Sequence, residues 1–164
     1  MTVAERLDRL GLTLPTVVAP VGAYVPALRT ADHVWTSGQL PFVDRELPVV
    51  GRVGDGAGLV VPDEAAALAR VAALNAVAAV AALLGAERDE EPVVALERVV
   101  RVVKVTGFVA SDPGFTAQPK VLDAASTLLH EIFGDAGVHV RSAVGVAVLP
   151  LGSPVEIELV VEAP

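Results

Sequence analysis

The sequence predicts an α+β fold, a mixed β-sheet with two long helices on one face, and three observations support it. Apolar and β-branched residues run through Arg98–Ala110 and Ala143–Leu149, as in buried strands. An alanine-rich segment from Pro62 to about Leu84 has the composition of a long helix. Val121, Leu122, Ala125, Leu128, Leu129 and Ile132 repeat at helical spacing within a second helix, Pro119–Phe133.

The 164 residues fit a single domain, 1–164, with an N-terminal extension over residues 1–19. Thr2 and Glu5 form a capping box, and Gly11 is a typical helix stop, so a short helix is expected between them. The first twelve residues alternate in charge and lack the apolar centre of a signal peptide, which favours a cytoplasmic location.

Two strands, Val25–Arg29 and Val34–Gly38, are expected next, joined by a tight turn. Gln39–Gly58 is rich in proline and glycine, which predicts a loop with one short strand. Its glycines invite a phosphate-binding interpretation, but neither G-x-G-x-x-G nor a GK[ST] ending is present. A flexible connection into the long helix is the favoured interpretation.

The first long helix should end at Gly85, and Glu87–Glu91 should follow as a solvated acidic loop. At the end of the chain, Val140–Leu149 and Val155–Glu162 are expected to pair as a hairpin. Two helices cover only one face of such a sheet, yet Ala143–Leu149 shows no polar alternation. Both faces of that strand should therefore be buried, and the sequence predicts an obligate oligomer.

Charge and composition argue against several classes of partner. Twelve Lys and Arg against twenty Asp and Glu give a net charge of -8, which disfavours nucleic acid and anionic membranes. The apolar helix contains Arg70 and Asn75 and is mostly alanine, so it is expected to pack in the protein rather than cross a membrane. The chain has no cysteine and its three histidines lack metal-ligand spacing, so no metal site is expected.

Arg141 is the residue that most invites a functional interpretation. It begins an apolar strand and would be partly buried, which requires a carboxylate or a ligand as partner. One interpretation is an internal salt bridge with Glu156 across the predicted hairpin, and the other is a bidentate clamp for a substrate carboxylate. The pattern alone leaves both open. Ser142, His139 and Asp135 are close in sequence, but a catalytic triad is recognised by geometry, so their proximity carries no weight.

Four blocks in order resemble the RidA (YjgF/YER057c/UK114) family. They are Ser37-Gly38-Gln39-Leu40-Pro41, Val103-Lys104-Val105 with Phe108-Val109, Arg141-Ser142-Ala143-Val144 with Leu149-Pro150, and Val155-Glu156-Ile157-Glu158. The match runs from about Pro20 to Glu162 and looks like the longer-chain branch of the family, also labelled endoribonuclease L-PSP. The resemblance implies a chorismate-mutase-like homotrimer with ligand sites in the clefts between subunits.

The resemblance also implies an activity. RidA proteins hydrolyse 2-imino acids of the 2-iminobutanoate and 2-iminopropanoate type, and their enamine tautomers, to 2-keto acids and ammonia without a cofactor. By position, Arg141 would grip the substrate carboxylate and Glu156 would position the attacking water. Tyr24, Ser37 and Gly38 would line the cleft, and the main chain at Ala143 would bind the reacting centre.

Two other functions stay open. One is a non-catalytic trimer with a regulatory role that binds small carboxylates such as 2-keto acids. The other is a ribonuclease, as the older family label suggests, although the net charge of -8 and the absence of a histidine pair argue against it.

Overall fold

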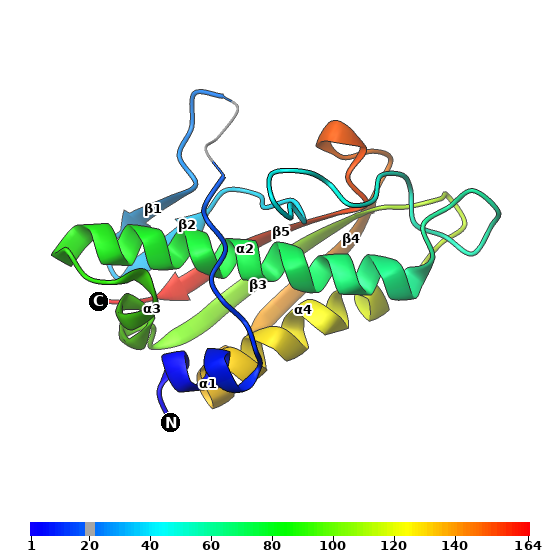
Figure 1. Cartoon of the computed structure of the whole chain (residues 1–164). Helices are drawn as coiled ribbons and strands as arrows, with labels where there is room; N and C mark the ends of the chain where they lie inside the picture. The colour runs from blue at the N-terminus through cyan, green and yellow to red at the C-terminus, as the bar shows by residue number, and fades with distance from the viewer. Residues whose placement is uncertain (19–21) are drawn as a thin grey trace.

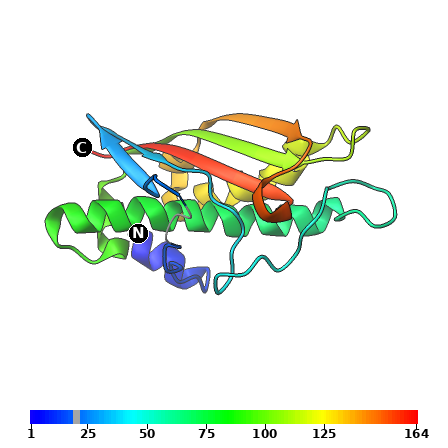
Figure 2. The same cartoon turned by 90° about the horizontal axis from the view of Figure 1, so that it is seen from above.

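The computed structural model describes residues 1–18 and 22–164, which form one five-stranded sheet with helices on one of its faces (Figures 1 and 2). The elements are α1 (Val3–Arg9), β1 (Ala27–Thr30), β2 (His33–Thr36), α2 (Pro62–Arg88), α3 (Pro92–Ala95), η1 (Leu96–Arg98), β3 (Arg101–Ala110), α4 (Gln118–Phe133), η2 (Gly134–Gly137), β4 (Val140–Val146), η3 (Pro150–Gly152) and β5 (Val155–Glu162). This architecture confirms the predicted fold class. The predicted extension over residues 1–19 ends at Ala19, which lies outside the described residues.

The sheet has the strand order β1-β2-β5-β3-β4. β3 and β4 are parallel and are connected through α4, whereas β5 is antiparallel to both of its neighbours, β2 and β3. The predicted hairpin of Val140–Leu149 with Val155–Glu162 is therefore wrong, because β3 lies between the two strands. β4 also ends at Val146, three residues earlier than expected, and is the edge strand.

The helix α2 packs on the sheet through alanines. Its buried residues are Ala65, Leu68, Ala69, Ala72, Ala73, Ala76, Val77, Ala78, Ala79, Val80, Ala81, Leu84 and Gly85. By length and composition alone α2 could cross a membrane, but 61% of its apolar window is buried inside the fold, as in a core helix. Small side chains let this helix approach β5 and α4 closely.

The predicted end of α2 at Gly85 is wrong. The helix continues to Arg88, and Asp89 caps it in the left-handed conformation with φ 54°. Gly85 serves close packing instead, because a Cβ there would lie 2.7 Å from the backbone oxygen of Glu90, where the chain folds back. Glu87 is exposed as expected, but it lies in the last turn of α2 rather than in a loop and forms ion pairs with Arg29 at 2.7 Å and with Arg98 at 3.6 Å.

Two predictions for the N-terminal helix are confirmed, and one prediction for the loop over Gln39–Gly58 is wrong. The Thr2–Glu5 capping box is present, and Gly11 follows the short helix with φ 65°. The short strand expected within Gln39–Gly58 does not form, since the described chain there makes only isolated bridges, such as Val53 with Val60.

The face of the sheet opposite α2 and α4 carries an exposed apolar row, and Figure 2 shows the helices on the other side. Leu28 pairs with Trp35, Trp35 with Val160, Val160 with Lys104, and Lys104 with Val140, so the row crosses all five strands and is apolar except for Lys104. Leu28 is 51%, Trp35 48% and Val140 65% exposed. The predicted subunit interface would cover this face, and the oligomer stays a prediction.

Candidate functional site

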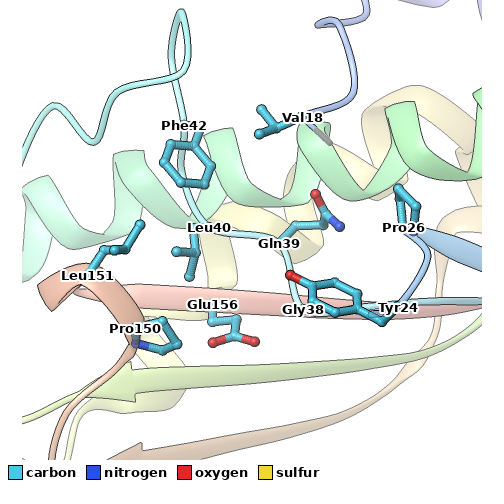
Figure 3. Close-up of a pocket in the computed structure, with 10 residues that line it drawn as sticks. All are labelled: Val18, Tyr24, Pro26, Gly38, Gln39, Leu40, Phe42, Pro150, Leu151 and Glu156. Carbon is cyan, nitrogen blue, oxygen red and sulfur yellow. The ribbon is translucent and has the colours of Figure 1, made fainter. Parts of the chain in front are cut away.

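A pocket of about 240 Å³ opens where the chain after β2 runs beside β5 (Figure 3). Its lining residues are Val18, Tyr24, Pro26, Gly38, Gln39, Leu40, Phe42, Pro150, Leu151 and Glu156. The lining is mostly apolar, and Glu156 carries the one carboxyl group among these residues. Three of the predicted site residues, Tyr24, Gly38 and Glu156, therefore share this pocket.

Gly38 and Glu156 are brought together by backbone pairing. The N–H of Gln39 donates to the carbonyl oxygen of Ile157 at 2.8 Å, and the N–H of Ile157 donates back to Gln39 at 3.0 Å. This bridge aligns Gly38 with β5, so that a Cβ on Gly38 would lie 1.6 Å from Oε1 of Glu156. The space beside Gly38 is thus filled by the carboxylate, and only glycine leaves room for it.

Ser37 supports the pocket rather than lining it. Its hydroxyl donates to the carbonyl oxygen of Val25 at 2.6 Å, and its N–H donates to Pro26 at 2.8 Å. These bonds tie the segment that carries Tyr24 to the end of β2. In Figure 3 the ring of Tyr24 and the carboxylate of Glu156 face the same cavity.

Asn75 on α2 is a part of the site that sequence reasoning did not find. Its Nδ2 donates to the carbonyl oxygens of Leu40 at 2.8 Å and Phe42 at 3.1 Å. These two bonds fix the loop that forms one wall of the pocket. The signal in the sequence was an amide within a long run of alanine and valine, where a partly buried polar side chain needs a partner.

Burial raises the pKa of the Glu156 carboxyl above its ordinary value, and the neighbouring Glu158 raises this pKa further. Both residues occupy alternate positions on β5 and project from the face opposite the helices. A carboxyl group with a raised pKa holds its proton closer to neutral pH, so Glu156 is suited to exchange a proton with a bound ligand or water.

Glu156→Gln is expected to stabilise the protein at neutral pH. A carboxyl whose pKa is higher in the folded state than in the unfolded chain destabilises the fold when ionised, above the folded pKa, and ceases to do so below the unfolded pKa. The gain should therefore be present at pH 7 and shrink toward pH 4. Urea unfolding of both proteins across this range measures it; a gain that is independent of pH would contradict the assignment to ionisation.

Arg141 lies in a different place. Its Nη1 donates to Asp123 Oδ1 and to Ser126 Oγ, each at 3.0 Å, and its Nη2 donates to the carbonyl oxygen of Pro119 at 3.2 Å. All three partners belong to α4 or its first turn. Arg141 is thus partly buried with a carboxylate partner, as the sequence predicted, but the carboxylate is that of Asp123.

Arg141 and Glu156 project from opposite faces of the sheet. Arg141 pairs with Val105, which pairs with Leu159, and both neighbours are buried under the helices. Glu156 pairs with Phe108 on the uncovered face. The internal Arg141–Glu156 salt bridge is therefore excluded.

Ala143 follows Arg141 on β4 and faces the same helices. It pairs with Gly107 and packs against the core. Within one chain, the structure brings Tyr24, Gly38 and Glu156 together, with Ser37 behind them, but Arg141 and Ala143 lie on the other side of the sheet. Among residues 1–18 and 22–164, no group of three or more His, Asp or Glu side chains is arranged to hold a metal ion.

The comparisons with known proteins cover almost the whole chain. Residues 4–163 match the family model described as "YjgF/chorismate_mutase-like, putative endoribonuclease". The protein TCP17 of Trypanosoma cruzi is 42% identical over 161 residues, which are 98% of this chain and 93% of that protein. A solved protein of unknown function from Agrobacterium tumefaciens is 34% identical with a TM-score of 0.83, covering 99% of this chain and 92% of that one. A solved "putative endoribonuclease" from Shewanella oneidensis is 33% identical with a TM-score of 0.86, covering 99% of both chains.

Proposed function

The chain belongs to the YjgF/chorismate-mutase-like family, and we propose that it hydrolyses reactive 2-imino acids to 2-keto acids and ammonia. The observation that supports this most is the carboxyl group of Glu156, held against Gly38 in a small, mostly apolar pocket. A pocket of about 240 Å³ suits a ligand of few non-hydrogen atoms and is small for a nucleotide. By their positions in the motifs that resemble the family, Arg141 would bind the substrate carboxylate and Glu156 would position the attacking water.

The reaction needs little beyond orientation. Water adds to C2 of the C=N bond and gives one proton to Glu156, which passes it to the nitrogen, so that a carbinolamine forms. The carbinolamine hydroxyl then gives its proton to the same nitrogen through Glu156, the C–N bond breaks, and ammonia leaves behind the 2-keto acid. Because burial raises the pKa of Glu156, its carboxylate is a stronger base than an exposed one and can take and return each proton. The imine carbon is already electrophilic, so a fixed carboxylate and one positioned water account for the acceleration.

The clamp in each cleft comes from a second copy of the chain. This proposal is supported by the opposite orientations of Arg141 and Glu156 in one subunit, since a site that uses both must draw them from two subunits. The exposed apolar row from Leu28 to Val140 supplies the surface for such contact. We expect a homotrimer, and light scattering at micromolar concentration should give three times the chain mass; a monomeric mass would contradict the shared cleft.

The test of the activity uses an imine generated in place. A pyridoxal-phosphate threonine dehydratase releases 2-iminobutanoate, and the formation of 2-oxobutanoate is followed with and without this protein. Faster keto-acid release with the wild type, at unchanged dehydratase activity, is the expected result. No acceleration at a protein concentration equal to that of the dehydratase would refute the hydrolase, and calorimetry with 2-oxobutanoate would then test the alternative of a carboxylate-binding protein.

The ribonuclease label is tested in the same preparation. The net charge of -8 opposes binding of a phosphate backbone, so we expect no partner among nucleic acids. RNA cleavage that disappears in the Glu156→Gln variant would assign the pocket to RNA instead. A cytoplasmic, membrane-free location accompanies this proposal, since 2-imino acids arise where pyridoxal-phosphate enzymes act.

A further inference from the structure

A second cavity of about 250 Å³ lies beside Arg141, between α4 and the start of β4. Its lining residues are Ser126, His130, Gly137, Val138, His139 and Arg141. Two of them, Ser126 and His139, have no part in the function proposed above. Ser126 is hydrogen-bonded both to His139 and to Arg141, each at 3.0 Å, so the three side chains form one connected polar cluster.

The hydrogen bonds between Arg141, Ser126 and His139 form a chain in which each group donates to the next one. Nδ1 of His139 lies 2.6 Å from the carbonyl oxygen of Gly137, which can only accept, so Nδ1 carries the proton. Nε2 of neutral His139 is then an acceptor, and the hydroxyl of Ser126, 3.0 Å away, donates to it. The oxygen of Ser126 is thereby oriented to accept from Nη1 of Arg141, also at 3.0 Å.

This arrangement holds one edge of the Arg141 guanidinium group and leaves the other available. Both hydrogens of Nη1 are directed to α4, one to Asp123 and one to Ser126. Nη2 donates to the carbonyl oxygen of Pro119, and in the described part of the chain no acceptor is bonded to Nε. The Nε–Nη2 edge can therefore receive a carboxylate in the bidentate geometry that arginine favours.

We propose that Ser126 and His139 are positioning residues that hold Arg141 for the substrate carboxylate, and that only the neutral form of His139 completes the chain of hydrogen bonds. The inference rests on the carboxylate-binding role of Arg141 in the proposed function. Asp123 alone would hold the guanidinium weakly, because its side chain is 66% exposed and such ion pairs contribute little. The partly buried Ser126 and His139 fix the orientation instead.

The charges around His139 favour its neutral form. Burial lowers the pKa of His139, the hydrogen bond to Gly137 opposes this, and the positive charge of Arg141 lowers the pKa further. Other titratable groups nearby in the fold are His130 and Asp123 on α4, Asp135 in η2 and Lys104 on β3 beside Val140. Protonation would turn Nε2 into a donor toward Ser126 and bring a second positive charge next to Arg141.

The variants Ser126→Ala, His139→Leu and His139→Gln separate this role from packing. Ser126→Ala and His139→Leu should weaken binding of 2-oxobutanoate about tenfold, raising KM for the imine similarly and leaving kcat nearly unchanged. His139→Gln places an acceptor where Nε2 lies, so it should restore wild-type affinity. Matched controls are Thr127→Ala, an exposed hydroxyl on the same helix, and His130→Gln, an imidazole in the same cavity.

The pH dependence of 2-oxobutanoate binding distinguishes a hydrogen-bond chain that needs neutral His139 from a simple electrostatic attraction between protonated His139 and the carboxylate. In the wild type, the Kd for 2-oxobutanoate should rise as the pH falls from 8 to 5 and His139 becomes protonated, whereas in His139→Gln this component should be absent. Glu156 titrates in both proteins, so the difference between the two profiles isolates His139. Affinity that increases in acid only when His139 is present would mean that its charge attracts the carboxylate, and would overturn the positioning role.

A readout without substrate keeps this inference separate from the proposed function. Side-chain ¹⁵N NMR of Arg141 should show a restrained guanidinium group in the wild type and His139→Gln, and faster motion in Ser126→Ala and His139→Leu. Restrained Arg141 signals in a wild type that neither accelerates 2-oxobutanoate release nor binds 2-oxobutanoate would refute the proposed function and leave the hydrogen-bond chain in place. Unchanged Arg141 signals and affinity in Ser126→Ala would refute the chain itself.

Discussion

Arg141→Ala is expected to reduce kcat/KM for imine hydrolysis by about a hundredfold or more, because the charged partner of the substrate carboxylate is removed from a partly buried site. Arg141→Lys should recover only part of this loss, since an ammonium group keeps the charge but lacks the two-pronged geometry. Dehydratase-coupled release of 2-oxobutanoate measures both. Because the hydrogen bonds of Arg141 in the described structure all go to α4 of its own chain, the oligomer should survive, and light scattering is the control.

Because Arg141 and Glu156 project from opposite faces of the sheet, mixed oligomers can test whether one site combines these residues from two subunits. If each site takes its arginine from one subunit and its carboxyl from another, Arg141→Ala and Glu156→Gln chains will both be inactive alone. Unfolding the two together in urea and refolding them as mixed oligomers should restore activity at those clefts that receive both intact residues. Activity that stays absent from verified mixed oligomers would show that no cleft combines the two residues from different chains.

Gly38→Ala is expected to reduce activity by about a hundredfold while leaving the protein folded. The new Cβ would lie 1.6 Å from Oε1 and 2.6 Å from Cδ of Glu156, so the carboxyl group must move away. The overlap involves the end of a flexible side chain, which can rotate, and for this reason the backbone is expected to keep its pairing with β5. Imine hydrolysis and circular dichroism together measure the two effects.

Gly114→Ala is the matched control, because a Cβ there meets nothing closer than Asp112 Oδ2 at 4.0 Å. Combining Gly38→Ala with Glu156→Gln should cost no more activity than Glu156→Gln alone, since both changes remove the same carboxylate from its position. Full activity in Gly38→Ala, or a further loss in the double variant, would mean that Gly38 matters for another reason.

Local patterns in the sequence predicted much of the fold. The capping box at Thr2, the apolar spacing of α4 and the existence of a strand over Val155–Glu162 all depend on neighbours along the chain, and all appear as expected. The order of strands in the sheet depends on distant contacts. A hairpin between the last two strands was the simplest local solution, and it failed because β5 pairs with β2 and β3 instead.

In the candidate site, too, some residues could be predicted from the sequence and others could be found only from contacts between distant parts of the chain. Tyr24, Gly38 and Glu156 were proposed from a resemblance to a family, and in the structure the three residues line one pocket. Glycine at position 38 could not be understood from sequence, because its reason is a carboxylate more than a hundred residues later. Ser126 and His139 gave no signal, since a single hydroxyl on a helix and a single histidine before a strand are common, and only the crossing of α4 over β4 brings them together.

The central position of β5 has a consequence for how the chain folds. β1 and β2 on one side and β3 and β4 on the other are joined in the sheet only through Val155–Glu162. During synthesis, β1 and β2, which precede α2 in the sequence, and β3 and β4, which follow it, therefore stay unpaired with each other until β5 leaves the ribosome. The alanine-rich α2, which is 27 residues long and helical by propensity, can form early and serve as the surface on which they are held. Closure of the sheet is then a late step that depends on contacts far apart in sequence, and the unpaired edges of β2 and β3 are exposed to aggregation until it occurs.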